Sequence, residues 1–361
     1  MHESRKRIAY WDNVKWFMIL LVVIGHFAGE YFDQSFISAT IHLFIYAFHM
    51  PVFFFVSGVF YDKSKAKNSF VYFIACGLLL KLAFALCNIF MGNEVKFYLL
   101  YEGDIPWFMF ALAYHYILMF FFGAGNRKYM LVVGILLACV VGYENIGDYL
   151  VLSRTILFFP FFIIGTMFTP QLREKANAMV RKYAYVFYPL AVVVLLFWGA
   201  ACLFKTDFIA VYLPLLKGRF VYPEEVISYG IWARLGCYLL STITGAAILI
   251  LCPRRRLKGI SYMGTKTINV YFWHWICYML LAGVLHFDDL YHAGFIGKAL
   301  YFVIAVVLCI VLSSVKLFDW PLRQVKAAIR FDAPKTEKTP DTVPQNTAEE
   351  KEEQPTGDEP L

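Results

Sequence analysis

Residues 10–30 read YWDNVKWFMILLVVIGHFAGE, and this stretch decides the fold of the chain. A polar start with Asp12 and Lys15 is followed by an apolar run, which His26 interrupts. A helix over this stretch is long enough to cross a bilayer, which takes roughly 20 residues. Lys15 and His26 then lie roughly 16 Å apart along the axis, on nearly the same face. An ionisable group in a membrane is costly, so His26 is a candidate functional residue; the alternative is a buried histidine satisfied by a neighbouring helix.

The composition of the whole chain agrees with a membrane protein. Its 361 residues are 60% hydrophobic and only 16% charged, whereas soluble domains carry about 25% charged residues. The net charge of +7 does not indicate nucleic acid, because the basic residues lie in short loops between apolar runs. The eight cysteines fall in or beside these runs without a CxxC spacing, so we expect small buried apolar groups and no metal site.

The apolar runs predict an all-α, polytopic bundle of about ten transmembrane helices. Lys and Arg gather in alternate loops and acidic residues in the others, which places both termini in the cytoplasm. The longest outer segment, 205–231, contains prolines and Gly218 and is expected to be a loop or re-entrant piece. We expect the spans near residues 14–30, 38–60, 70–91, 105–123, 129–143, 152–168, 186–204, 232–252, 267–285 and 298–318.

A change in composition divides the chain into two parts. Residues 1–330 form the predicted membrane domain. Residues 331–361 are rich in Pro, Thr, Glu and Lys and poor in large apolar side chains. Such a segment cannot bury a core, so a disordered cytoplasmic tail is expected.

The second and third spans contain further ionisable groups. His42 and His49 lie in the second, and Pro51 follows His49 where a proline would free backbone carbonyls. For His42 interhelical hydrogen bonding is the better interpretation, whereas His49 is favoured as functional. Lys81 lies deep in the third span with no acidic residue evident at its depth, so either an anionic ligand or a snorkelling side chain explains it.

Later spans add aromatic and basic candidates near the outer side. Trp107 opens the fourth span as an interfacial aromatic residue would. Arg154 lies near the outer end of the sixth span, and His274 stands between two tryptophans in the ninth. For His274, a packed core histidine and a functional one are equally compatible with the sequence.

These groups favour a particular chemistry. The intramembrane polar residues are histidines and cations, whereas proton-coupled pumps usually have Asp or Glu relays. The sequence contains no HExxH, GxSxG or glycine-rich nucleotide motif. Histidine suits a base or proton carrier because its unperturbed pKa is near neutrality, and the basic inner loops suit a polyanionic donor.

Four stretches, with a weaker fifth, resemble the acyltransferase-3 family of integral membrane acyltransferases, and within it the fucose 4-O-acetylase-like branch. The first fits the family's basic residue, ten residues and histidine, although lysine replaces the usual arginine and lacks its planar fork. The family's extra extracytoplasmic esterase-like domain has no counterpart here. The stretches are DNVKWFMILLVVIGH (12–26), YAFHMPVFFFVSGVF (46–60), PWFMFALAYHYI (106–117), SRTILFFPFFIIG (153–165) and TINVYFWHW (267–275).

The resemblance implies an O-acyltransferase of the plasma membrane. It would move an acyl group, acetyl by default, from cytoplasmic acyl-CoA to a hydroxyl of a cell-surface polysaccharide or lipid-linked glycan of the cell envelope. Acyl-CoA is then a substrate, and no bound cofactor is expected. The resemblance implies that His26 is the general base and His49 a second catalytic group. Donor binding would then involve Lys15, Asp12 and Lys81, and the residues that bind or orient the acceptor would be Trp107, Arg154 and His274.

Other readings stay open from the sequence. A covalent acyl carrier would use Ser57 or His26 in place of direct transfer. A secondary transporter or exporter of a short-chain acid or glycan precursor also fits buried histidines, although buried carboxylates and an inverted repeat are not evident. An assembly subunit of a polysaccharide export machine is a third class. The acceptor and the oligomeric state are not readable.

Overall fold

The computed structural model describes residues 9–95, 97–123 and 125–329, and this part of the chain is built of helices. Within it, strand-like pairing is limited to one antiparallel bridge between Tyr101 and Tyr149. The all-α fold class is confirmed. The division into a membrane domain, residues 1–330, and a tail stays a prediction, and the tail predicted for residues 331–361 lies outside the described residues.

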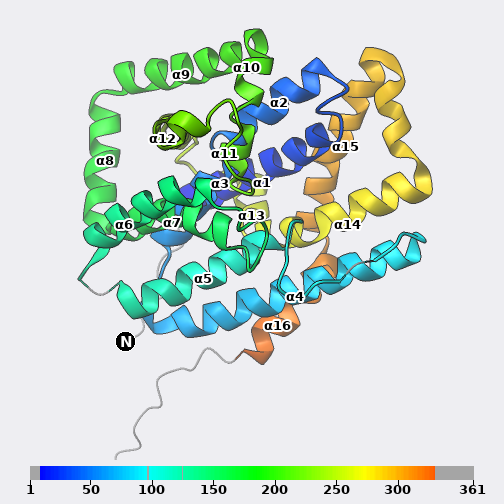
Figure 1. The fold of residues 1–361 in the computed structure, drawn as a ribbon, viewed down its shortest axis with the longest axis horizontal. Coiled ribbons are helices and arrows are strands. Elements are labelled where there is room, and N and C mark those ends of the chain that lie inside the picture. Colours follow the sequence, from blue (N-terminus) through cyan, green and yellow to red (C-terminus); the bar gives the residue numbers. More distant parts are fainter. Residues whose placement is uncertain (1–8, 96, 124, 330–361) are drawn as a thin grey trace, which may run out of the picture. The chain divides into compact units, whose positions relative to one another are not determined.

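The helices vary in length from one turn to seven (Figure 1). The long ones are α1 (Ala9–Glu30), α4 (Ala66–Phe90), α9 (Ala184–Phe204), α12 (Gly230–Leu251), α14 (Thr267–Leu285) and α15 (Gly294–Ser314). Those of intermediate length are α2 (Phe36–Tyr46), α3 (His49–Val59), α5 (Trp107–Phe122), α6 (Arg127–Val140), α7 (Leu152–Met167) and α8 (Pro170–Lys182). The short ones are α10 (Thr206–Ala210), α11 (Leu213–Lys217), α13 (Lys258–Met263) and α16 (Leu322–Ala328).

Among the described residues, seven helical segments are long and apolar enough to cross a membrane. An eighth results if α7 and α8, which meet at an angle of 87°, are counted as one broken span. Helices α5 and α6 have only 16 and 14 residues. Every predicted span therefore contains a helix, while the count of ten and the cytoplasmic position of the termini stay predictions.

The outward faces of the long helices carry large apolar side chains. Leu86 and Phe90 on α4, Phe197 on α9 and Val303 on α15 are exposed. In water such a surface would be costly, whereas a bilayer accepts it. Seven of the eight cysteines are buried, as predicted, and Cys277 is partly buried.

Helix α1 lies in the middle of the helices and contacts α2, α3, α13, α14 and α15 (Figure 1). Its first turn also holds the basic loop after α12. The amide of Asn13, which is fully buried, donates to the carbonyls of Pro253 (2.8 Å) and Arg255 (2.9 Å) and accepts from the hydroxyl of Ser261 (2.7 Å). Two hydrogen bonds thus hold the basic loop, and a third holds α13, against the start of α1 near Lys15.

Helices α3 and α7 approach each other until their backbones touch. A Cβ atom on Gly58 would lie 2.1 Å from the carbonyl oxygen of Phe162, and one on Gly165 would lie 2.1 Å from that of Phe55. Only glycine permits this approach, as in other close helix crossings in membranes. The crossing fixes the spacing between the walls of the cavity described next.

Candidate active site

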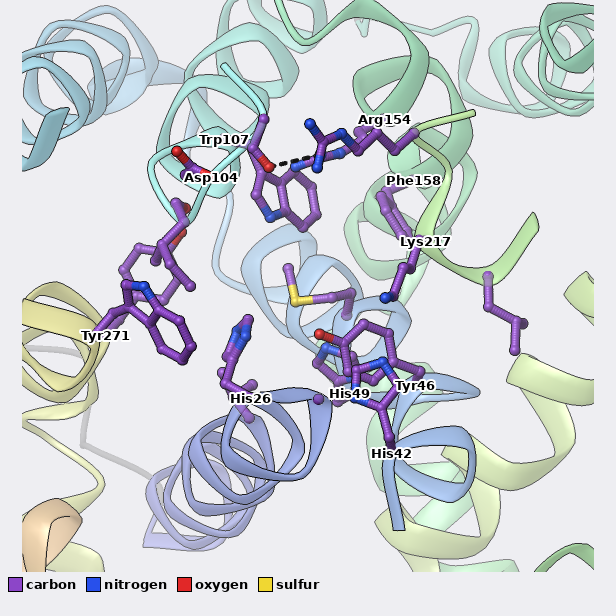
Figure 2. Close-up of a pocket in the computed structure, with 18 of the residues that line it drawn as sticks. His26, His42, Tyr46, His49, Asp104, Trp107, Arg154, Phe158, Lys217 and Tyr271 are labelled. Carbon is purple, nitrogen blue, oxygen red and sulfur yellow. Dashed lines mark hydrogen bonds between the residues drawn. The ribbon is translucent and has the colours of Figure 1, made fainter. Parts of the chain in front are cut away.

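A cavity of about 330 Å³ opens beside the C-terminal half of α1 (Figure 2). Its walls come from α1, the α2–α3 junction, the segment before α5, α7, the segment around α11, and α14. Its polar and aromatic lining consists of His26, Glu30, His42, Tyr46, His49, Asp104, Trp107, Arg154, Phe158, Lys217, Arg219, Phe220, Tyr271 and Trp275. The chain therefore brings four of the eight predicted site residues, His26, His49, Trp107 and Arg154, into one cavity.

His26 is the imidazole with free nitrogens in this cavity. It is half-buried, and within the described part of the chain its ring nitrogens make no hydrogen bond. Its ring centroid lies 5.4 Å from that of His274 and 5.6 Å from that of Trp275. Figure 2 shows the ring pointing into the space between Tyr271 and His49. Both nitrogens are available to a substrate.

The neighbouring histidines are anchored instead. Each holds its Nδ1 within 2.9 Å of a backbone carbonyl, and because a carbonyl only accepts, Nδ1 must carry the proton. In the neutral ring, Nε2 is then a hydrogen-bond acceptor. The Nε2 atoms of His42 and His274 are buried without a partner among the described residues. The anchoring carbonyls are Gly25 for His42, Ile45 for His49, and Val270 and Tyr271 for His274.

A break in the second span explains the position of His49. The helix stops after Tyr46 and restarts at His49, so Pro51 falls in the first turn of α3. Prolines are tolerated there because first-turn N–H groups have no partner within the helix. The predicted kink is thus a break, and the hydroxyl of Ser241 donates to the carbonyl of Ala47 within it (2.6 Å).

The outer rim is held by a network of charges. Arg154, which is buried, donates to the carbonyl of Gly103 (3.0 Å) and to Asp148 (3.1 Å). Its guanidinium lies 4.8 Å from the ring centre of Trp107. Asp148 also pairs with Arg219 at 2.7 Å. Arg154 is therefore fixed against Trp107, with its charge shared with Asp148.

Sequence reasoning missed Lys217, which lies in the outer segment expected to be a loop. This segment folds back so that Lys217 lines the cavity, with its ammonium 5.2 Å from the ring centre of Tyr46. Among the described residues it forms no ion pair. Burial, followed by the nearby Arg219 and Arg154, lowers the pKa of Lys217 to about 8. The paired Lys-Gly-Arg in an otherwise apolar segment was the available signal.

The two lysines predicted to bind the donor, Lys15 and Lys81, form different ion pairs. Lys15 pairs with Asp12 at 2.8 Å, which their i,i+3 spacing on α1 permits. The expectation that Lys81 lacks an acidic partner is wrong: the loop before α5 brings Glu102 within 3.0 Å. Burial nevertheless raises the pKa of Glu102 above its ordinary value. Both residues line a separate cavity, so Lys81 does not need an anionic ligand.

A bundle of long apolar helices is typical of a multi-pass membrane protein, and here the bundle encloses a cavity with histidines, cations and aromatic walls. The sequence model of the acyltransferase-3 family, described as an acyltransferase domain, matches residues 8–317. The chain belongs to this family, as its motifs predicted. Membership of the fucose 4-O-acetylase-like branch stays a prediction.

One curated relative is the nodulation protein NolL of Sinorhizobium fredii (strain NBRC 101917 / NGR234). The two are 26% identical over 228 residues, which is 56% of this chain. The chain spans 58% of the length of that relative. No solved structure matches the chain.

Proposed function

We propose that this protein is a plasma-membrane O-acyltransferase. It moves an acyl group, acetyl by default, from cytoplasmic acyl-CoA to a hydroxyl of a cell-surface or lipid-linked glycan, with His26 as general base. The observation that carries the proposal is the contrast between His26, whose ring nitrogens face a cavity without protein partners, and the anchored histidines around it. A general base must have a free lone pair within reach of the proton that it takes.

Charge on the inner side supports a coenzyme A donor. Arg255, Arg256 and Lys258 are exposed on the basic loop that Asn13 ties to the start of α1. Lys15 lies on the same end of the helix, oriented by Asp12. Several cations near the start of α1 favour a ligand with several phosphates. The donor's thioester then reaches toward His26 along α1.

The lining of the outer cavity supports a sugar acceptor. Trp107, Trp275 and Tyr46 offer aromatic faces, while Lys217 and Asp104 offer polar groups. Pockets that bind polar organic molecules combine apolar walls with a few placed polar groups in this way. Because Arg154 already bonds to Asp148 and Gly103, its proposed part is to hold Trp107 in place, and Lys217 is the better partner for an acceptor's polar groups.

In the proposed reaction the acceptor oxygen bonds to the acyl carbon as the carbon–sulfur bond of the thioester breaks. The hydroxyl proton passes to His26 and then to the departing thiolate, so that coenzyme A leaves as its thiol. A positioned base contributes about 10²–10⁴-fold to such a step.

The tautomers of the anchored rings limit their roles. The free Nε2 atoms of His49 and His274 can accept a hydrogen bond but cannot donate one, so these rings suit orientation of the acceptor hydroxyl or of His26. Trp107 has only a donor, its indole N–H, and is the better candidate to stabilise the oxyanion. Ser57, one of the two candidates for a covalent route, donates to the carbonyl of Phe53 (2.9 Å) and lines a different cavity from His26. This argues against Ser57 as an acyl carrier and leaves His26 as the other candidate; we propose direct transfer with His26 as base.

The test combines a glycan measurement with a donor measurement. Mass spectrometry of surface glycans from cells with and without the protein should show acetyl esters that depend on it. Inner-membrane vesicles that contain the protein should then transfer label from radiolabelled acetyl-CoA, added on the cytoplasmic side, to the same glycan. Movement of a glycan precursor across the membrane with no label transferred would instead favour the transporter.

A further inference from the structure

A second, smaller cavity of about 140 Å³ lies next to the first. It is lined by Lys15 at one end and otherwise mostly by apolar side chains from α1, α3, α5 and α14. Val22, Met50 and Tyr271 line both cavities. These three residues, here called the partition, are therefore the layer of side chains between the inner and outer spaces.

One face of α1 runs past the partition. Lys15, Ile19 and Val22 line the inner cavity, and Val22 and His26 line the outer one. Their spacing of four, three and four residues places them in one stripe along the helix. Val22 is one turn from His26, roughly 6 Å along the axis. A group that lies at the partition is thus within one turn of the proposed base.

The three side chains differ in their freedom to move. Tyr271 is buried, and its hydroxyl donates to the carbonyl of Ile105, which fixes one wall. Val22 is 3% exposed and branched at Cβ, so its rotamer in a helix is restricted. Met50 is also buried, but its unbranched side chain has three rotatable bonds and adapts to different shapes. Movement of Met50 is the simplest way to join the two cavities.

We propose that the partition holds the donor's acyl group and that Val22 and Met50 set the longest acyl chain that the enzyme accepts. This inference rests on the proposed function. A donor that enters from the Lys15 end reaches the partition with its acyl end first, and a group at the partition is roughly one turn of α1 from His26. Because Val22, Met50 and the fixed Tyr271 close the path ahead of the acyl group, a short chain such as acetyl lets the thioester carbonyl approach the base, whereas a longer chain collides with these side chains and holds the carbonyl back.

The test uses Val22→Ala and Met50→Ala, with Val14→Ala as the matched control. Val14 is on the same helix and 1% exposed, but it belongs to the core cluster with Trp11 and Met18 and lines neither of these two cavities. The quantity measured is the kcat/KM for hexanoyl-CoA divided by that for acetyl-CoA, on one preparation of each variant. This ratio does not depend on the fraction of protein that is folded.

We expect the ratio to rise about tenfold or more in Val22→Ala and Met50→Ala. These changes remove two and three non-hydrogen atoms, and even one methylene in an apolar pocket changes selectivity by about 10–200-fold. The control should keep the wild-type ratio. The inference would be overturned if both partition variants kept the wild-type ratio, or if the ratio rose equally in Val14→Ala. In either case, transfer of acetyl by the wild-type protein would leave the proposed function intact. Absence of transfer from any acyl-CoA by the wild-type protein would overturn both.

Discussion

Replacing His26 by glutamine should separate catalysis from folding. The ring of His26 makes no hydrogen bond to the described protein and is half-buried. Its loss therefore costs ring contacts with His274, Trp275 and Tyr46, each about 0.5–1.5 kcal/mol at most. Loss of a general base lowers kcat by about 10²–10⁴-fold, which corresponds to roughly 2.7–5.5 kcal/mol of transition-state stabilisation. The activity should therefore fall far more than the thermal midpoint.

The matched control is His115→Gln. His115 is fully buried, its Nε2 lies 2.8 Å from the carbonyl of Thr155, and it does not line the cavity around His26. This variant should lose stability but keep its turnover per folded molecule. The assay is transfer of label from acetyl-CoA, normalised to folded protein from a thermal-shift measurement. Turnover of His26→Gln within threefold of wild type would refute the assignment of the base.

Four further outcomes are expected. Lys217→Met should raise the KM for the acceptor about 10–100-fold, since a hydrogen bond to a charged group contributes about 1.5–3 kcal/mol. In the wild-type protein the KM for the acceptor should rise as the pH passes about 8, where Lys217 loses its proton. In a pH series the KM of the variant should not change. Lys15→Gln should raise the KM for acyl-CoA roughly tenfold with little change in kcat, measured at two salt concentrations to expose charge screening. Asp319→Asn breaks the 2.6 Å pair with Lys266 and should lower the free energy of unfolding by about 1 kcal/mol or less near neutral pH. The pair lowers the pKa of Asp319 in the folded state, so the difference between variant and wild type should vanish in acid, as the pH falls through the folded-state pKa of Asp319. Gly58→Ala should destabilise the protein by at least about 1–3 kcal/mol, visible as reduced accumulation in the membrane, and unchanged accumulation would contradict the backbone contact between α3 and α7.

The helices and the stripe on α1 could be predicted because they depend on local patterns. Apolar runs and periodic charges mark helices wherever they lie, and the eleven-residue spacing of Lys15 and His26 sets their common face without reference to the rest of the chain. The motif stretches also brought His49, Trp107 and Arg154 into the candidate site, and all three line the cavity. His274 was predicted as well, and it lies beside His26 without being part of the lining.

The missed features depend on contacts between distant segments. Lys217 enters the cavity because the segment after α9 folds back, and the pairing of Lys81 with Glu102 needs a loop that returns toward α4. No periodic pattern in the sequence predicts that either of these segments folds back. The sharp bend at the start of α8 was more accessible, because the hydroxyl of Thr169 accepts from the N–H of Leu172 and Pro170 stands at the first helical position.

The glycine crossing of α3 and α7 also determines how the protein can change shape. Backbones in direct contact cannot slide without breaking that contact, so the imidazole of His49 on one helix and the guanidinium of Arg154 on the other behave as parts of a single rigid frame. The segment around α11 is a short helix followed by Gly218 with a φ of 67°, and it forms one wall of the cavity that His49 and Arg154 also line. A bulky polymer would then gain entry by displacement of this one segment, and a cross-link between it and α7 should block large acceptors while a small alcohol still reacts.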